Sequence, residues 1–169
     1  MTKKEVINFN MKNVCVGISS NNYGRTYFAK KDFNVGEEIM RGWGKVIDHQ
    51  TPHISVQIEV KKHYLPKKWT GRYWNHSCGP NAYIKTRSDG FPSLFALKKI
   101  KKGEEITYNY SMTEYAWIKN ADENRVKCAC GQKNCKNKIY SFSQLTRKKQ
   151  DSLRKNRLCS KYLQYAKIN

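Results

Sequence analysis

The sequence predicts a mostly β fold, of the β-rich α+β class, in which several small twisted sheets precede a helical C-terminal tail. Short apolar runs separated by turn residues fill residues 1–112, and no long amphipathic helix pattern is found among them. The apolar spacing becomes roughly helical only after Tyr140. With 169 residues, the chain is long enough for one main domain and a small appendage.

Two pairs of short strands are expected to form hairpins. Residues 14–18 and 25–29 flank the segment SSNNYG, whose Ser, Asn and Gly residues favour turns. Residues 82–87 and 93–100 flank the segment SDGFP, which gives the strongest hairpin signal in the sequence. Both pairs indicate antiparallel sheet.

Three further segments lie between these hairpins. Residues 37–47 are strand-like and contain two glycines at which the backbone could bend. Residues 53–60 alternate in polarity, as a half-buried strand does. Residues 61–71 are interrupted by Pro66 and Gly71, and we expect them to form a loop.

The C-terminal segment, Tyr140–Asn169, carries eight Lys or Arg residues and one acidic residue. Its apolar residues recur at roughly helical spacing, which predicts one or two basic helices. Two interpretations stay open. Either the apolar stripe packs on the domain and the basic face is solvated, or the helices bind nucleic acid.

The whole chain is strongly basic. It has 33 Lys and Arg against 13 Asp and Glu, a net charge of +20. Such an excess favours a polyanionic partner such as nucleic acid, although a solvated lysine-rich surface is the simpler alternative. No apolar stretch is typical of a signal peptide or a membrane span, so we expect an intracellular protein that does not enter a membrane.

The cysteines point to a metal site rather than to disulfides, because an intracellular protein is kept reduced. Cys128, Cys130 and Cys135 are closely spaced, and Gly131 allows the chain to turn back between them. This spacing suits three thiolates that converge on one tetrahedral ion, with the fourth ligand still to be found.

Four motifs together resemble one family. The segments RYWNHSCGPN (72–81), GEEITYNY (103–110) and CACGQKNC (128–135) resemble signatures of the SET-domain protein lysine methyltransferases that carry a post-SET zinc motif. Residues 21–39 are similar to the opening segment of that family, and the resemblance covers residues 14–139.

This resemblance implies a SET fold with pseudoknot-like threading and no pre-SET domain. It divides the chain into a SET domain, a post-SET zinc segment and a basic helical tail, which correspond to residues 1–125, 126–139 and 140–169.

The family uses S-adenosylmethionine as methyl donor and releases S-adenosylhomocysteine. By resemblance, Asn75 and His76 bind this cofactor, and Tyr23 and Gly24 lie in the first cofactor-binding loop. Arg72 either anchors the NHSC segment near the cofactor or makes a structural salt bridge.

Two tyrosines correspond to the family's catalytic positions. Tyr110 matches the essential tyrosine, whose hydroxyl lies at the transfer site, and is also expected to contact the cofactor. Tyr108 matches the phenylalanine/tyrosine position at which a hydroxyl limits the number of methyl groups added, so we expect mono- or dimethylation. The sequence departs from the family at Asn22, which replaces a glycine, and at Asn109, which replaces an aspartate.

The resemblance also supplies the missing metal ligand. In the family the cysteine of NHSC completes the zinc site, which assigns structural Zn²⁺ to Cys78, Cys128, Cys130 and Cys135. A zinc-bound segment would bring Ile139 and Tyr140 close to the substrate channel. The remaining thiols, Cys15 and Cys159, are interpreted as buried or inert.

The function implied is methylation of a lysine in a histone or histone-like protein, in the nucleus or on chromatin, or in a host nucleus for a viral or intracellular microbial protein. The basic surface would bind nucleosomal DNA, while an acidic groove with Glu114, Asp122 and Glu123 would accept the histone tail. Two alternatives remain: a methyltransferase for a non-histone protein, and a catalytically silent SET-like module that binds chromatin or DNA.

Overall fold

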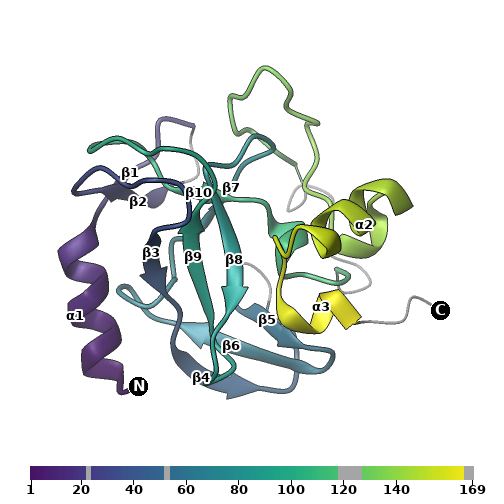
Figure 1. The fold of residues 1–169 in the computed structure, drawn as a ribbon, viewed down its shortest axis with the longest axis horizontal. Coiled ribbons are helices and arrows are strands. Elements are labelled where there is room, and N and C mark those ends of the chain that lie inside the picture. The colour runs from purple at the N-terminus through teal and green to yellow at the C-terminus, as the bar shows by residue number, and fades with distance from the viewer. Residues whose placement is uncertain (22–23, 52–53, 118–126, 166–169) are drawn as a thin grey trace.

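The computed structural model describes residues 1–21, 24–51, 54–117 and 127–165 (Figure 1). The strands of these residues form two three-stranded and two two-stranded sheets, and the helices are short and lie at the two sides of the molecule. The β-rich α+β class with a helical C-terminal segment is therefore confirmed.

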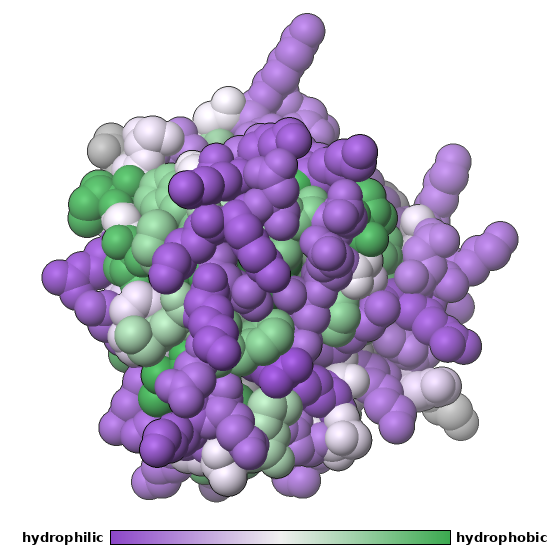
Figure 2. All heavy atoms as spheres, turned by 60° about the vertical axis from the view of Figure 1, so that its left-hand side comes forward, coloured by the Kyte–Doolittle hydropathy of each residue, from purple (hydrophilic) through white to green (hydrophobic). Residues whose placement is uncertain are grey.

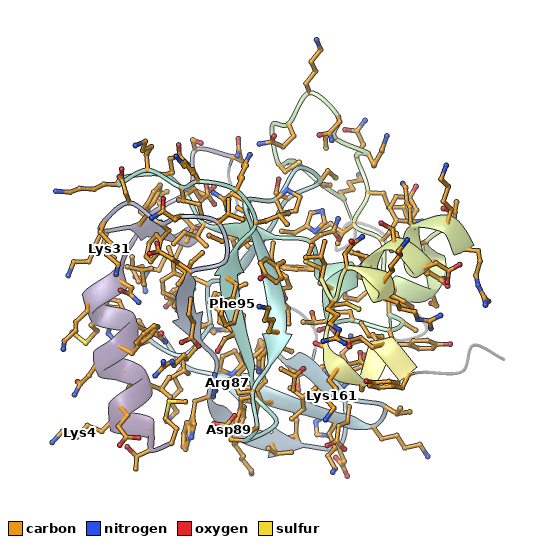
Figure 3. All side chains as sticks on the ribbon, in the orientation of Figure 1. Lys4, Lys31, Arg87, Asp89, Phe95 and Lys161 are labelled. Carbon is orange, nitrogen blue, oxygen red and sulfur yellow. The ribbon has the colours of Figure 1, made fainter. Side chains whose placement is uncertain are left out.

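Both predicted hairpins are present. Strands β1 (Val14–Ile18) and β2 (Arg25–Ala29) are antiparallel, and β8 (Ala82–Thr86) pairs in the same way with β9 (Pro92–Ala96). Strand β3 (Glu38–Arg41) adds to the other edge of β9. In the β8–β9 turn, labelled in Figure 3, the Arg87 guanidinium forms an ion pair with Asp89 at 3.0 Å.

The second three-stranded sheet corrects one expectation. Its central strand, β6 (Lys62–Pro66), pairs with both β4 (Gly44–Ile47) and β5 (Val56–Glu59), although residues 61–71 were expected to form a loop. Pro66 is the last residue of β6, where the missing amide hydrogen does not interrupt the strand. The residues after Pro66 form the turn that the sequence indicates.

A two-stranded parallel sheet joins the two principal motifs. Strand β7 (Asn75–His76) pairs with β10 (Thr107–Tyr108), so that Tyr108 lies opposite His76. The amide of Ser77 extends this pairing by donating to the Tyr108 carbonyl at 3.0 Å. Segments about 30 residues apart in the sequence thus become neighbours.

Helix α1 (Lys3–Asn13) was not predicted. Thr2 and Glu5 form a capping box at its start, which is a sequence signal that could have identified it. Polar side chains hold much of this helix on the domain. The side-chain amides of Asn10 and Asn13 donate to the backbone carbonyls of Arg41 and Ile39. The apolar periodicity of α1 is therefore weak, and a search for long amphipathic helices before residue 112 does not find this helix.

The C-terminal segment contains the expected helices, α2 (Arg147–Lys155) and α3 (Lys161–Tyr165), which lie on the side opposite α1 (Figure 1). The short 3₁₀ helices η1 (Tyr110–Met112) and η3 (Phe142–Gln144) connect it to the sheets. Phe142 and Leu163 are fully buried in the main core, so the apolar stripe packs on the domain. The division of the chain at residues 125 and 139 remains a proposal.

Basic side chains are spread over the surface. Figure 2 shows a face covered mainly by hydrophilic side chains, several of which project far from the surface. In Figure 3, Lys4, Lys31 and Lys161 lie on well separated parts of the molecule. None of the described helices has the length and apolar character needed to cross a bilayer.

Candidate active site and four-cysteine cluster

A cavity of about 490 Å³ opens beside the β7–β10 pair. Its size is within the range of small-molecule sites in proteins. It brings together five of the residues that the sequence singled out, namely Arg72, Asn75, His76, Tyr108 and Tyr110. The turn before β7, the two strands and the turn after β10 therefore present these groups to one space.

Tyr110 is fixed at both its backbone and its hydroxyl. Its amide donates to His76 Nδ1 at 3.2 Å, and its hydroxyl donates to the Trp74 carbonyl at 2.9 Å. The rings of Tyr110 and His76 meet edge to face, with centroids 5.2 Å apart. Burial raises the pKa of Tyr110, so the phenol stays neutral and keeps its hydrogen.

His76 is neutral as well. Burial lowers the pKa of its imidazole to about 4. Because Nδ1 accepts the Tyr110 amide, the ring hydrogen lies on Nε2, which is 3.6 Å from Cys78 Sγ. His76 thus connects the cavity with the cysteines.

Three aromatic rings form one wall of the cavity. Tyr108 is only 2% exposed, and its hydroxyl lies 3.2 Å from Thr113 Oγ1. Trp74 packs edge to face on Tyr108, and Tyr110 lies on the other side with its ring centroid 5.2 Å away. Because aromatic faces attract cations, this wall suits a positively charged ligand.

The other expected cofactor residues are placed less completely. The side-chain amide of Asn75 donates to the Arg25 carbonyl at 3.2 Å, which holds β7 against β2. Gly24 has a φ of 75° and its carbonyl accepts from the Ser19 amide at 2.8 Å, but it does not line the cavity. Tyr23 lies outside the described residues, as does Asn22.

Glu114 occupies a place that the sequence did not predict. It was expected in an acidic groove that accepts the histone tail; it is only 4% exposed and lines the cavity. Its carboxylate accepts from the Gln57 amide and from Gln50 Nε2, both at 2.9 Å. Burial raises the pKa of this carboxyl to about 7. The other two acidic residues of the expected groove, Asp122 and Glu123, lie outside the described residues.

Arg25, Trp74 and Lys127 also line the cavity and were missed as site residues. Trp74 directly precedes Asn75 in the NHSC motif, and that position was a signal that could have identified it. Arg25 and Lys127 carry no such signal, because only the fold brings them to the cavity.

The structure gathers the four cysteines that were assigned to zinc. The Sγ atoms of Cys78, Cys128, Cys130 and Cys135 all lie within 4.8 Å of one another. The Cys78–Cys128 distance is 3.7 Å. Tetrahedral Zn–S bonds of about 2.3 Å place the sulfurs about 3.8 Å apart, so the four thiols fit this ion.

Backbone amides around the cluster favour thiolates. The amide of Cys78 donates to Cys130 Sγ at 3.5 Å, and the amide of Asn137 donates to Cys135 Sγ at 3.4 Å. Burial raises the pKa of the Cys130 thiol, but hydrogen bonds from the amides of Cys78 and Gln132 outweigh this effect and lower it to about 7. The charged form that binds metal is thereby stabilised.

Of the two residues after the cysteines that were expected near the substrate channel, one lines the cavity. Ile139 lines the cavity, and its carbonyl accepts from Trp117 Nε1 at 3.2 Å. Tyr140, which was expected beside the substrate channel, lines a separate hollow next to α2. Cys159 is buried and Cys15 is exposed, and both lie outside the four-cysteine cluster.

Comparisons with known proteins agree with this arrangement. Residues 28–111 match the SET domain family. The chain is 30% identical over 137 residues to a histone-lysine N-methyltransferase, H3 lysine-36 specific, from Yarrowia lipolytica. It is 38% identical over 131 residues to a protein of the same name from Candida albicans. These alignments cover 70% and 66% of this chain, but 17% and 15% of those two proteins.

A solved structure shares the fold. The crystal structure of KRYPTONITE in complex with mCHH DNA, an H3(1–15) peptide and SAH has a TM-score of 0.58 and 24% sequence identity. The likeness covers 76% of this chain and 29% of that chain. This likeness shows a shared fold, and the family match over residues 28–111 identifies this chain as a SET-domain protein.

Proposed function

We propose that this chain is an S-adenosylmethionine-dependent protein lysine N-methyltransferase that acts on a histone or histone-like protein. The observation that carries the proposal is the cavity that Tyr110, Tyr108 and Trp74 line together, with their rings packed on one another. The relatives named as histone-lysine methyltransferases support the same reaction and substrate class.

The residues present suit this cofactor. S-adenosylmethionine supplies a methyl group on a cationic sulfonium, which the aromatic wall would attract. Asn75, His76 and Arg72 would hold the cofactor at the cavity, with Tyr23 and Gly24 contributing from the first loop. S-adenosylhomocysteine is the expected product.

The chain's contribution to the reaction is mainly positioning. The lysine nitrogen must be neutral so that its electron pair can form the new N–C bond, while the C–S bond breaks and its electrons remain on sulfur. A lysine ammonium has a pKa of about 10.4 in water, and an apolar site lowers it. The Tyr110 hydroxyl, held by Trp74, would orient the reacting groups.

We infer that the product is mainly mono- or dimethyl-lysine. Tyr108 carries a hydroxyl in the wall of the cavity, and this hydroxyl lies 3.2 Å from Thr113 Oγ1. A fixed polar group at this place occupies space and excludes additional methyl groups from the amine.

The four cysteines would hold one structural Zn²⁺, because four thiolates leave no open coordination position. The His76 Nε2–H beside Cys78 Sγ would donate to the metal-bound sulfur. The ion would thereby keep Ile139 at the cavity.

Nucleosomal DNA is the proposed partner of the basic surface, and the nucleus or chromatin is the proposed location. The net charge of +20 supports phosphate contacts, because it far exceeds what solubility needs. If phosphates are bound, the affinity for nucleosomes must fall steeply between low and physiological salt. An affinity that hardly changes would exclude this partner.

Transfer of labelled methyl groups tests the proposed reaction directly. The chain would be incubated with labelled S-adenosylmethionine and with free histones, nucleosomes or a cell extract, and Tyr110→Phe would be the control. Label on histones that depends on Tyr110 supports the proposal. Label only on other proteins indicates a non-histone substrate, and absence of label from every protein indicates a catalytically silent module.

A further inference from the structure

We propose that Glu114 binds the side-chain ammonium of the substrate lysine and accepts one of its protons before methyl transfer. This inference rests on the proposed function, and it assigns a substrate-binding role to a residue that the family motifs in this sequence do not include.

The turn after β10 places Glu114 close to both catalytic tyrosine positions. The Glu114 amide donates to the Tyr110 carbonyl at 2.8 Å, which closes a single tight turn. The side chains of Tyr108, Tyr110 and Glu114 consequently line the same cavity. A lysine side chain that reaches Tyr110 therefore enters the cavity that Glu114 lines.

Neutral donors hold the carboxylate, and its charge is left unbalanced. One oxygen accepts from the backbone amide of Gln57 and the other from Gln50 Nε2, and the Thr113 side chain also hydrogen-bonds the carboxylate. Each carboxylate oxygen can accept a further hydrogen bond. Among the described residues, no cationic side chain forms an ion pair with Glu114. A buried, unpaired carboxylate is costly, and a bound ammonium would relieve that cost.

The surroundings also favour proton acceptance near neutral pH. Burial raises the pKa of Glu114 to about 7, so both forms of the carboxyl are accessible there. Four phenols that interact electrostatically with Glu114 have raised pKa values and stay neutral: Tyr64, Tyr108, Tyr110 and Tyr162. The other ionisable groups that line the cavity are His76, which is neutral at this pH, Arg25, Arg72 and Lys127.

The proton step is balanced in atoms and charge. The lysine ammonium gives one proton to the Glu114 carboxylate, which yields a neutral amine and a neutral carboxylic acid. The nitrogen electron pair is then free for reaction. The carboxylic acid returns its proton to solvent before the next cycle.

A purely structural role makes a different prediction. The Glu114 carboxylate also links η1 to β5 through Gln57, so its loss could simply loosen this contact. Loosening would weaken the binding of every peptide in a similar way. A carboxylate that binds the ammonium affects only peptides that carry one.

Peptide binding separates these two roles without any turnover. The probes are a histone-tail peptide whose methylated lysine has been mapped with the wild-type protein, and the same peptide with norleucine, which keeps the carbon chain but lacks the ammonium. Dissociation constants are measured with S-adenosylhomocysteine present. The preference for lysine over norleucine should be about tenfold greater in the wild type than in Glu114→Gln, since a hydrogen bond to a charged group is lost.

Two further variants keep this test decisive. Gln50→Met removes one hydrogen bond to Glu114 but leaves the carboxylate, so the preference for lysine should persist. Glu114→Asp retains a carboxylate and should retain part of the preference, and it replaces Glu114→Gln if that variant does not fold. An equal lysine preference in the wild type and in every folded Glu114 variant overturns the proposal.

The pH profile of methyl transfer gives the second readout. In the wild type, kcat/KM should rise as the pH passes about 7, because the carboxylate form is required. In Glu114→Gln the rise should move to higher pH, toward the pKa of about 10.4 of free lysine. Identical profiles for active wild type and Glu114→Gln overturn the role of Glu114 but leave the methyltransferase proposal intact. A wild type that transfers no methyl group to any protein overturns the methyltransferase proposal itself.

Discussion

The cavity and the four-cysteine cluster are neighbours that are held in different ways. The aromatic wall of the cavity belongs to the main core, where Trp74 and Tyr108 are 4% and 2% exposed. The cysteines form a separate small cluster with Ile139. A β-bridge between Lys127 and Lys138, together with turns, holds this segment.

The cavity and the cysteine segment are therefore ordered by different interactions. Apolar burial shapes the cavity, and it acts without any ligand. The cysteine segment buries little apolar surface, so we expect its order to depend on the proposed zinc site. Tyr110 and His76 contact both regions. Tyr110 packs on the main core and on the cysteine cluster, and His76 lies beside Cys78. Substitutions should therefore affect either the chemistry or the metal-dependent assembly.

Tyr110→Phe should have the largest effect on activity and a small effect on folding. Loss of a positioned hydroxyl at the transfer site should lower kcat on the order of 10²- to 10³-fold. The free energy of unfolding should fall by only about 1 kcal/mol, because one hydrogen bond to the Trp74 carbonyl is lost. Methyl-transfer assays and thermal unfolding measure the two effects. Tyr140→Phe, at a tyrosine outside the cavity, is the matched control. Substantial activity in Tyr110→Phe would contradict the assigned role.

Cys130→Ser should disrupt the other region. We expect loss of bound zinc and a fall in activity that approaches about 10²-fold, because Ile139 would no longer be held at the cavity. Elemental analysis of the purified protein measures zinc, and a chelator should reproduce the loss in the wild type. Cys15→Ser changes an exposed thiol outside the cluster and should retain both zinc and activity. Full activity in zinc-free protein would remove the proposed dependence.

The features that the sequence predicted correctly are encoded locally. Both hairpins follow from local turn signals, and the cysteine cluster follows from spacing together with the family motifs. These features are encoded within short segments. The proximity of Cys78 to Cys128 needed the family resemblance, because 50 residues separate them in the sequence.

The features that were missed depend on contacts between distant segments. Helix α1 is held by buried asparagines that bond to β3, so it has little apolar periodicity to detect. Strand β6 exists because β4 and β5 pair with its two edges, whereas Pro66 and Gly71 had indicated a loop. Glu114 is buried by Gln57, which is 57 residues away, and a charged residue in a sequence gives no sign of such a partner.

Tyr108→Phe should change the product within the intact cavity. Removal of the hydroxyl frees space beside the amine, so the fraction of trimethyl-lysine should rise while total activity changes only a few-fold. The aromatic ring and its packing on Trp74 are retained. Mass spectrometry of the methylated substrate measures the distribution, and Tyr83→Phe, a buried tyrosine outside the cavity, is the control. An unchanged distribution would argue against this role of Tyr108.

Trp117→Phe should give the smallest effect, because it weakens only the contact between the two regions. Its indole packs on the cysteine cluster and donates to the Ile139 carbonyl at 3.2 Å. A neutral hydrogen bond contributes about 1 kcal/mol, which corresponds to about a fivefold change in an equilibrium. We therefore expect KM for the peptide to rise a few-fold, while zinc content and kcat stay near those of the wild type.

Trp43→Phe is the matched control, since Trp43 stacks on Phe91 away from both regions. A rise in KM specific to Trp117→Phe would show that the cysteine segment contributes to substrate binding through Ile139. A loss of zinc in Trp117→Phe would instead mean that apolar packing helps to hold the cluster together. In that case the cysteine segment would depend on apolar packing by Trp117 as well as on the metal.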